Sequence, residues 1–342
     1  MLTSTKVMDK LTQKMLAAIE EELKAAVDGA AGPGLSELHQ MLSYHMGWEG
    51  EGSGPEARGK RIRPLMVLLS AAAAGTDWEK AIPAAAATEL IHNFSLIHDD
   101  IEDKSPLRRG RPTLWTKWGV PQAINAGDCM FTLAHLKLLE LERMTTPETA
   151  LKAARLLQKT CLHLTQGQYL DIAYEKRGDL DLEAYWPMVS GKTAALLSAC
   201  TELGARVAGV SEETCLAYAD FGRYLGLAFQ AQDDLLGIWG DAALTGKSAE
   251  SDLLSGKKSL PVLYGLDKRK AFAERWAQGA VTVEEVAGLA STLEQEGAYE
   301  YTQERAIAYT EQALAALEKA KPQGEAGEIL FNLAKRLVDR KV

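Results

Sequence analysis

The chain has 342 residues, of which 46% are apolar and 25% are charged, and its formal net charge at pH 7 is −9. This composition is that of a globular protein long enough to form two domains or one large one. The excess of acidic residues argues against nucleic-acid binding, which depends on a broad basic surface. We expect no nucleic-acid partner, and any bound anion must be held by a local group of cations.

No segment has the length or composition of a membrane anchor. The most apolar stretch, residues 65–75, is much shorter than the roughly 20 residues that cross a bilayer, and no apolar signal core follows Met1. We therefore expect a soluble, cytoplasmic protein without a transmembrane segment. Four widely spaced cysteines lie among apolar neighbours, which is typical of buried free thiols and not of disulfides or zinc ligands: Cys129, Cys161, Cys200 and Cys215.

Long segments rich in Ala, Leu, Glu, Gln and Lys, separated by sparse prolines, predict an almost entirely helical chain without a sheet of any size. Capping residues followed by acids indicate helix starts at Thr146, Ser211 and Thr282. A polar, glycine-rich loop is expected over 50–59, and one domain is favoured over two. The predicted helices span residues 7–28, 36–46, 60–74, 79–103, 121–143, 147–176, 182–209, 211–239, 257–278, 282–293, 296–320 and 324–340.

The helix predicted over 79–103 has polar residues on a face that should be buried. Spacings of three and four residues align four side chains on it: His92, Leu96, Asp99 and Asp103. The helix ends in Asp-Asp-Ile-Glu-Asp at 99–103, where acids oppose the helix dipole at a cost of several tenths of a kcal/mol each. A solvated acidic helix end is one interpretation. The other is a functional cluster that requires a compensating cation.

A second pair of carboxylates, Asp233 and Asp234, lies within the apolar stretch 221–239. Buried paired carboxylates are strongly unfavourable unless they are neutralised. A third polar stripe ends in Gln168 and Asp171, for which a buried hydrogen-bonded pair is the simpler interpretation. Clustered hard oxygen ligands suit Mg²⁺, which usually binds through one or two carboxylates and substrate phosphates. Two aspartate clusters facing each other across a helical cavity would form a magnesium–diphosphate site.

Isolated cations accompany both acidic clusters. Taken singly, each is explained as a solvated side chain, but their positions beside the aspartates favour an anion site, especially near a helix start. These cations are Lys60, Arg63, Arg108, Arg109, Arg111, Lys192, Lys247, Lys257 and Lys258.

With these motifs, the chain resembles the trans-isoprenyl diphosphate synthases, the polyprenyl synthetase family of head-to-tail prenyltransferases, from about Gly59 to Pro261. The resemblance implies an all-α fold, a large single-domain bundle of antiparallel helices around a central cavity, spanning 1–342 and usually a homodimer. The motifs, in this order, are Gly59-Lys60-Arg61-x-Arg63-Pro64, Leu96-Ile97-His98-Asp99-Asp100-x-x-Asp103 with Arg108-Arg109-Gly110, Gly191-Lys192-Thr193, Phe229-Gln230-x-x-Asp233-Asp234, and Gly256-Lys257 with Leu260-Pro261.

The resemblance also implies roles for individual residues. Three Mg²⁺ ions are expected with bound substrate, held by Asp99 and Asp103 with Asp100 in support, and by Asp233 with its neighbour Asp234. The residues expected to clamp the allylic diphosphate are Arg108, Lys192, Lys247 and Lys257. Those expected to bind isopentenyl diphosphate are Lys60, Arg63, His92 and Arg109. Gln230 and Thr193 would lie along the reacting chain, and the catalytic set would be Asp99, Asp103, Asp233, Lys192 and Gln230.

One position departs from the family pattern. The second motif usually reads DDxxD, but here Gly237 stands where the last carboxylate is expected. Asp241 lies eight residues after Asp233, roughly on the same face if the helix continues, although Gly237 and Gly240 weaken that helix by up to about 1 kcal/mol each relative to Ala. We hypothesise that Asp241 or water fills the vacant position.

The product is expected to grow along the helix that contains Asp99, past Ser95 and Thr88, with Ile91 to one side. Phe94 lies about 140° around the helix from Asp99 and would narrow the tunnel less directly. Within the family, an aromatic residue five before the first motif and a small residue four before it most often accompany a C20 product. We therefore predict geranylgeranyl diphosphate, with farnesyl or longer-chain products as the alternatives.

Two other functions remain open. A class I terpene cyclase shares the ionisation chemistry but binds one diphosphate, which would leave Lys60, Arg63 and Arg109 without a purpose. A non-catalytic subunit of a heteromeric prenyltransferase is favoured only by Gly237 and is opposed by the intact motifs.

Overall fold

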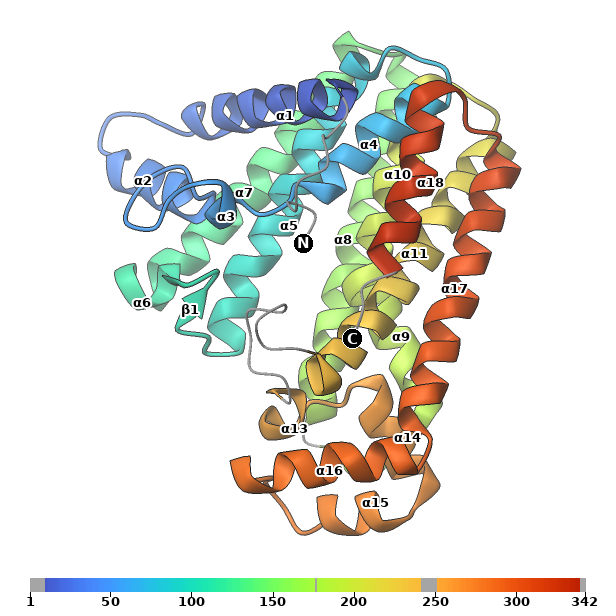
Figure 1. Cartoon of the computed structure of the whole chain (residues 1–342). Coiled ribbons are helices and arrows are strands. Elements are labelled where there is room, and N and C mark those ends of the chain that lie inside the picture. Colours follow the sequence, from blue (N-terminus) through green and yellow to red (C-terminus); the bar gives the residue numbers. More distant parts are fainter. Residues whose placement is uncertain (1–9, 176, 241–250, 339–342) are drawn as a thin grey trace.

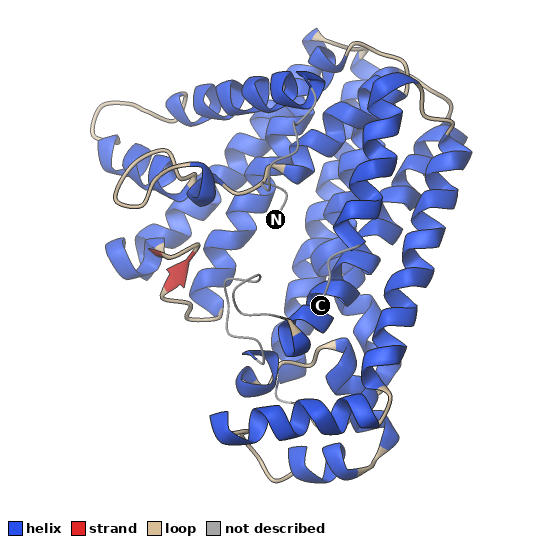
Figure 2. Ribbon diagram, viewed as in Figure 1, coloured by secondary structure: helices blue, strands red, loops and turns tan. Residues whose placement is uncertain are grey.

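The computed structural model describes residues 10–175, 177–240 and 251–338. Figure 2 shows that these residues form helices joined by short loops, with one pair of very short strands. The first elements are α1 (Lys10–Asp28), α2 (Ser36–His45), α3 (Pro55–Arg58), α4 (Ile62–Ala73), η1 (Trp78–Ala81), α5 (Ile82–Glu102), β1 (Leu107–Arg108), β2 (Arg111–Pro112), α6 (Leu114–Trp118), α7 (Val120–Leu139), η2 (Glu140–Arg143) and α8 (Pro147–Glu175).

The second half of the chain continues the helical pattern, which confirms the predicted all-α class. Its elements are η3 (Leu182–Ala184), α9 (Tyr185–Val189), the π-helical turn η4 (Ser190–Ala194), α10 (Ala195–Ala208), α11 (Glu212–Trp239), α13 (Ser251–Ser255), α14 (Leu260–Lys268), α15 (Ala271–Trp276), α16 (Val283–Gln295), α17 (Ala298–Ala320) and α18 (Gly324–Val338).

Side-chain caps fix helix starts where the sequence predicts them. The Oγ atom of Ser211 accepts a hydrogen bond from the backbone N–H of Thr214 at 3.2 Å, directly before α11. The backbone N–H of Thr282 donates to the Glu285 carboxylate at 2.9 Å, before α16. Each bond satisfies a donor at the start of a helix, as a capping residue followed by an acid should.

Several predicted boundaries are wrong for local backbone reasons. The helix expected over 257–278 is two helices, because Arg269 has a left-handed backbone (φ 52°) that ends α14. The helix expected from residue 60 begins at Ile62, because Arg61 is also left-handed (φ 50°). The helix expected over 182–209 is interrupted by the turn η4.

Other elements were not predicted. The loop expected over 50–59 contains α3, and the segment after α5 forms a two-residue antiparallel hairpin, β1 with β2, followed by α6. Residues 7–9 and 339–340 of the predicted terminal helices lie outside the described residues, as do Asp241 and Lys247.

The long helices run side by side in a bundle (Figure 1). The most extensive packing joins α11 to α17, α5 to α7, and α10 to both α11 and α4. In Figure 1, α1 to α3 lie across one side of the bundle, and α13 to α16 form its lower end. A large apolar cluster extends from α1 to α11 and on to α18, and two smaller clusters lie around α9 and α14 and around α16.

All four cysteines lie in the described residues as free thiols, three of them buried and Cys129 half-buried. None of the described helices is long and apolar enough to span a membrane.

Candidate active site

The C-terminal end of α5 presents the first aspartate cluster. Asp99 is half-buried and Asp103 is exposed, whereas Asp100 is only 3% exposed. Burial raises the pKa of Asp99 to about 6, and the negative charge of Asp103 adds to this effect, while the positive charge of Lys192 opposes it. The two carboxylates are therefore near enough to repel each other, and both interact with the same lysine.

Arg108 supplies the cation that this acidic helix end requires. Its Nε donates to both carboxylate oxygens of Asp100, at 2.8 and 2.9 Å. A charge-assisted pair of this kind is stronger than a neutral hydrogen bond. Asp100 thus holds the arginine and faces away from solvent, which agrees with a supporting position and not with direct contact to a metal ion.

Lys192 reaches the acidic cluster through an irregular turn. It belongs to the π-helical turn η4, a type of irregularity that is frequent at functional sites. Its Nζ donates to Asp171 of α8 at 2.5 Å. The simpler interpretation of the polar stripe on α8, a buried hydrogen-bonded pair, is wrong: Asp171 pairs with Lys192, and Gln168 on the same face donates to Glu102 at 2.7 Å.

Two glycines allow this approach. A Cβ atom on Gly167 would lie 2.1 Å from the backbone nitrogen of Lys192, and a Cβ atom on Gly191 would lie 2.5 Å from the carbonyl oxygen of His163. Backbones therefore touch where α8 meets η4, and a side chain on either glycine would separate them. Gly191 belongs to the predicted lysine motif, whereas Gly167 was missed because nothing in its neighbourhood marks it.

Asp234 is the fully buried member of the second carboxylate pair. Its carboxylate is 1% exposed and accepts three hydrogen bonds: from Gln230 Nε2 at 3.0 Å, from the Tyr185 hydroxyl at 2.8 Å and from the backbone N–H of Leu260 at 2.8 Å. With its oxygens engaged by the protein, Asp234 anchors α11 to α9 and α14. In this structure Asp234 is engaged by the protein, and its expected place beside the metal ligand Asp233 stays a prediction.

Asp233 is half-buried beside it. Its charge acts on Lys257 and also on Arg63 of α4. Gln230 completes this part of the site, because its Oε1 accepts a hydrogen bond from the Thr193 hydroxyl at 2.9 Å. The predicted neighbours Gln230 and Thr193 are thus brought together by α11 and η4.

The vacant position of the second aspartate motif has a carboxylate beside it. A Cβ atom on Gly237 would lie 2.5 Å from Oδ2 of Asp252, a residue of α13. Oδ2 of Asp252 also lies 4.0 Å from Nζ of Lys257. Although burial alone would lower the pKa of Lys257, the charges of Asp234, Asp252 and other aspartates raise it.

The second group of cations surrounds a neutral histidine. Arg63 Nη1 donates to His92 Nε2 at 3.2 Å. Burial and the charge of Arg63 hold the pKa of His92 well below its usual range, so the ring is uncharged and can accept. Among the described residues, the buried Nε of Arg63 has no hydrogen-bond partner, which leaves a donor for an anion.

The rest of this group lies on two neighbouring turns. Arg109, with a left-handed backbone (φ 53°), donates from Nη1 to the carbonyl oxygen of Ala57 at 2.8 Å. Lys60 is exposed and lies two residues before the start of α4, with Arg61 between them. Lys60 and Arg63 thus come from the start of α4, His92 from α5, and Arg109 from the turn between β1 and β2.

The residues expected to determine product length lie on α5 at different depths. Ser95 is half-buried, and its hydroxyl donates to the His92 carbonyl oxygen at 2.8 Å. Ile91 and Thr88 are fully buried, one and two turns further along. The Phe94 ring packs against Phe131 of α7, with centroids 4.9 Å apart, so it points toward α7.

Comparison with known proteins gives one consistent result. Residues 54–293 match the family model described as polyprenyl synthetase. A farnesyl diphosphate synthase of Mycobacterium tuberculosis is 38% identical over 314 residues, covering 89% of this chain and 86% of the relative. A geranylgeranyl diphosphate synthase of the same species is 39% identical over 290 residues, covering 83% and 82%.

Solved structures agree with the sequence relatives. A polyprenyl synthetase from Streptomyces coelicolor superposes with a TM-score of 0.86 at 37% identity, covering 95% of this chain and 98% of that one. The chain therefore belongs to the polyprenyl synthetase family and is a trans-prenyltransferase of the farnesyl and geranylgeranyl diphosphate synthase type.

Proposed function

We propose that the protein condenses isopentenyl diphosphate with an allylic diphosphate (dimethylallyl, geranyl or farnesyl) to a longer trans-prenyl diphosphate. The supporting observation is that the site has two groups of cations. One, with Lys192 and Lys257, borders the aspartates, and the other contains Arg63 and Arg109 beside the neutral His92. Two diphosphates need two such groups.

Mg²⁺ is the metal that this donor set fits. Asp99 and Asp103 would hold it from α5, and Asp233 from α11. Within the described residues, no three His, Cys, Asp or Glu side chains are arranged to hold a metal by themselves. This suits an ion that takes its other ligands from diphosphate and water, as Mg²⁺ usually does. We extend the family expectation of three such ions to this protein, where bound Mg²⁺ neutralises charge on the leaving group.

We further propose that Asp252 supplies the carboxylate that Gly237 lacks. Its Oδ2 is within contact distance of the position that a side chain at 237 would occupy. The hypothesis that Asp241 fills this position concerns a residue outside the described part of the chain, and Asp252 offers an explanation from a residue within it.

The remaining side chains stabilise charge and orient the substrates. Lys192, Arg108 and Lys257 would bind the allylic diphosphate, with Lys247 as a further expected contact outside the described residues. The allylic C–O bond breaks, and its electron pair leaves with the diphosphate. The π electrons of isopentenyl diphosphate then form the new C–C bond, and a proton is lost to the released diphosphate. Fixed charges that stabilise the departing group would supply most of the rate enhancement.

Gln230 and Thr193 are suited to face the reacting carbons. The Thr193 hydroxyl and the Gln230 amide form one hydrogen-bonded unit, anchored at the other end on Asp234. Their oxygens would stabilise developing positive charge, and no side chain needs to act as a nucleophile.

The product is proposed to be geranylgeranyl diphosphate, with farnesyl diphosphate as the alternative. Ser95 is half-buried and would be the first residue of α5 that a growing chain meets, one turn before Asp99. Replacing Ser95 with Phe should shorten the main product, which chain-length analysis after dephosphorylation would detect. An unchanged product would mean that Ser95 does not line the tunnel.

A homodimer is also proposed. The outer side of α8 exposes large apolar side chains at spacings of seven and eleven residues, namely Leu151, Leu162 and Tyr169. Their spacing puts them on one helix face, which is typical of an association surface. Light scattering after gel filtration would test this, and a Leu162→Glu variant should shift the mass toward a monomer. A cytoplasmic location remains a prediction.

The first experiment is incubation of the purified protein with isopentenyl diphosphate and each allylic primer, with and without Mg²⁺. A Mg²⁺-dependent C20 alcohol after dephosphorylation is the expected result, whereas a C15 product would keep the reaction and refute the predicted length. A cyclic hydrocarbon from the primer alone would indicate a cyclase. No product, rescued by a partner protein, would indicate a non-catalytic subunit.

A further inference from the structure

The turn before α4 has an unusual backbone. Gly59 (φ 77°) and Arg61 (φ 50°) are both left-handed, with Lys60 between them. Glycine suits the positive φ at position 59, and a Cβ atom there would also displace the Arg109 guanidinium, whose Nη2 would lie 2.6 Å away. Arg61, in contrast, carries a side chain although its backbone has a conformation that few residues other than glycine adopt. Such a conformation persists only where the surroundings hold it.

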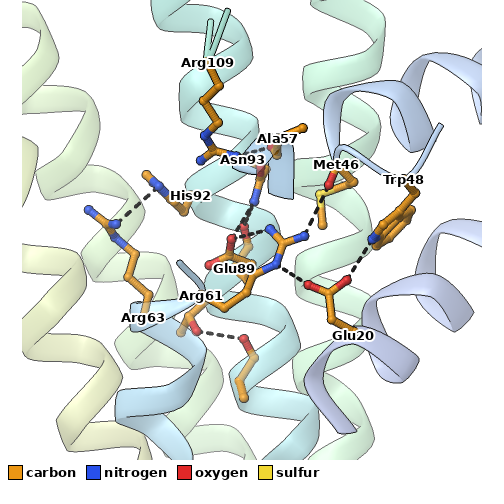
Figure 3. A network of polar contacts seen from close by, with 12 residues as sticks. Glu20, Met46, Trp48, Ala57, Arg61, Arg63, Glu89, His92, Asn93 and Arg109 are labelled. Atoms are coloured by element: carbon orange, nitrogen blue, oxygen red, sulfur yellow. Dashed lines mark hydrogen bonds and ion pairs between the residues drawn. The ribbon is translucent and has the colours of Figure 1, made fainter. Parts of the chain in front are cut away.

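Buried ion pairs hold Arg61 in place. Its side chain is 3% exposed, and it bridges two carboxylates: Nε donates to Glu20 of α1 at 2.7 Å, and Nη1 donates to Glu89 of α5 at 2.7 Å. Each carboxylate is itself fixed, Glu20 by the Trp48 indole N–H at 2.8 Å and Glu89 by the Asn93 amide at 3.0 Å. Figure 3 shows Arg61 between the two acids, where it joins α1, α4 and α5.

The ion-pair network of Glu20, Arg61 and Glu89 ends one helical turn from His92 and the cations beside it. Glu89 precedes His92 by three residues on α5, so both lie on the same side of that helix. Arg61 pairs with Glu89, and Arg63 pairs with His92, which ties the start of α4 to α5 at two successive turns. The charge of Glu89 also acts on both Arg63 and Arg109, so it is a buried counter-charge that the two arginines share.

We propose that Arg61 is a positioning residue for the isopentenyl diphosphate subsite, which orients Lys60 and Arg63 toward a shared anion by clamping the left-handed turn between Glu20 and Glu89. Its own charge is taken up by the two carboxylates, so it does not bind the diphosphate. Through Glu20 and Trp48, the N-terminal helix becomes part of the support of this subsite. The inference rests on the proposed function, which assigns Lys60, Arg63, His92 and Arg109 to isopentenyl diphosphate.

The test uses the full-length protein and measures binding as well as turnover. Arg61→Lys keeps the positive charge but cannot bridge both acids with a planar fork. We expect it to weaken binding of isopentenyl diphosphate alone, measured by calorimetry, by roughly 10- to 100-fold, the scale of a small misplacement of binding groups. The affinity for dimethylallyl diphosphate with Mg²⁺ should stay unchanged, so KM rises for one substrate and not for the other.

Two further variants make the result decisive. Glu20→Gln, at the half-buried outer end of the Arg61 ion-pair network, should also weaken binding of isopentenyl diphosphate, to a smaller extent than Arg61→Lys does. Arg206→Lys is the matched control, because Arg206 bridges Glu202 and Glu212 on α10 and α11 in the same way. It should change stability without changing either affinity.

The outcomes separate the possible failures. If Arg61→Lys and Glu20→Gln lower the melting temperature but leave isopentenyl diphosphate binding unchanged, the network only fastens helices and the inference is wrong. An Arg63→Lys variant, measured in parallel, tests the proposed function itself. If it too binds isopentenyl diphosphate normally, the assignment of the subsite fails, and the role of Arg61 fails with it.

Discussion

Asp233 and Asp234 are adjacent in the sequence, and the structure predicts opposite consequences for replacing them. Asp234→Ala removes the acceptor for three donors, of which the Tyr185 hydroxyl and the Leu260 N–H are buried. A buried donor left without a partner costs about 1–3 kcal/mol. With two such donors, we expect the free energy of unfolding to fall by roughly 2–6 kcal/mol.

Asp234→Asn should cost less. The amide keeps one oxygen that can accept from Tyr185 and Leu260, while its nitrogen faces Gln230, whose own amide can turn to present an oxygen. The main loss is then the negative charge, and hydrogen bonds to charged groups exceed neutral ones by about 1 kcal/mol. We expect a loss of about 1–2 kcal/mol with Mg²⁺ activation retained.

Equilibrium unfolding in urea, with Mg²⁺ titrations of turnover, tests this pair of expectations. Asp233→Asn is the matched control at the half-buried neighbour, and it should lose turnover and Mg²⁺ response with a smaller loss of stability. The reasoning is refuted if Asp234→Ala unfolds at the same urea concentration as the parent protein. It is also refuted if Asp234→Asn weakens the Mg²⁺ response as much as Asp233→Asn does.

Three further predictions follow from particular contacts. Gly167→Ala would force α8 away from the backbone nitrogen of Lys192, 2.1 Å from the new Cβ; we expect turnover to fall by about 100-fold, and unaltered kinetics would contradict the close approach. Asp252→Asn should raise the Mg²⁺ concentration needed for half-maximal activity, measured by titration, and an unchanged value would remove Asp252 from the metal site. Burial tends to raise the pKa of Glu20, but the charge and hydrogen bonds of Arg61 outweigh it and lower this pKa below the ordinary 4.5. Glu20 therefore adds stability above about pH 4.5, and this stability disappears as the pH falls through its lowered folded-state pKa. The free energy of unfolding of Glu20→Gln should thus fall less steeply in acid than that of the parent protein. Parallel curves of unfolding free energy against pH would contradict the pairing.

The helical pattern of the chain and much of the site follow from local sequence. Helix periodicity aligns Asp99 with Asp103, and it aligns Gln168 with Asp171, because residues three and four apart share a face. Capping residues such as Ser211 act on the turn that follows them, so helix starts are visible in a few letters. The excess of acids at the end of α5 likewise indicates a partner cation, which Arg108 provides.

Only the tertiary structure decides which of two adjacent aspartates is available to a ligand. Asp233 and Asp234 are equivalent in the motif. Only Asp234 accepts hydrogen bonds from Tyr185 and Leu260, which lie 26 or more residues away in the sequence. The same holds for Asp252, which meets Gly237 only because α13 folds back on the end of α11. Such contacts join segments that are far apart in the sequence, and their closeness in space follows no regular spacing of residues. Helix periodicity therefore cannot reveal them.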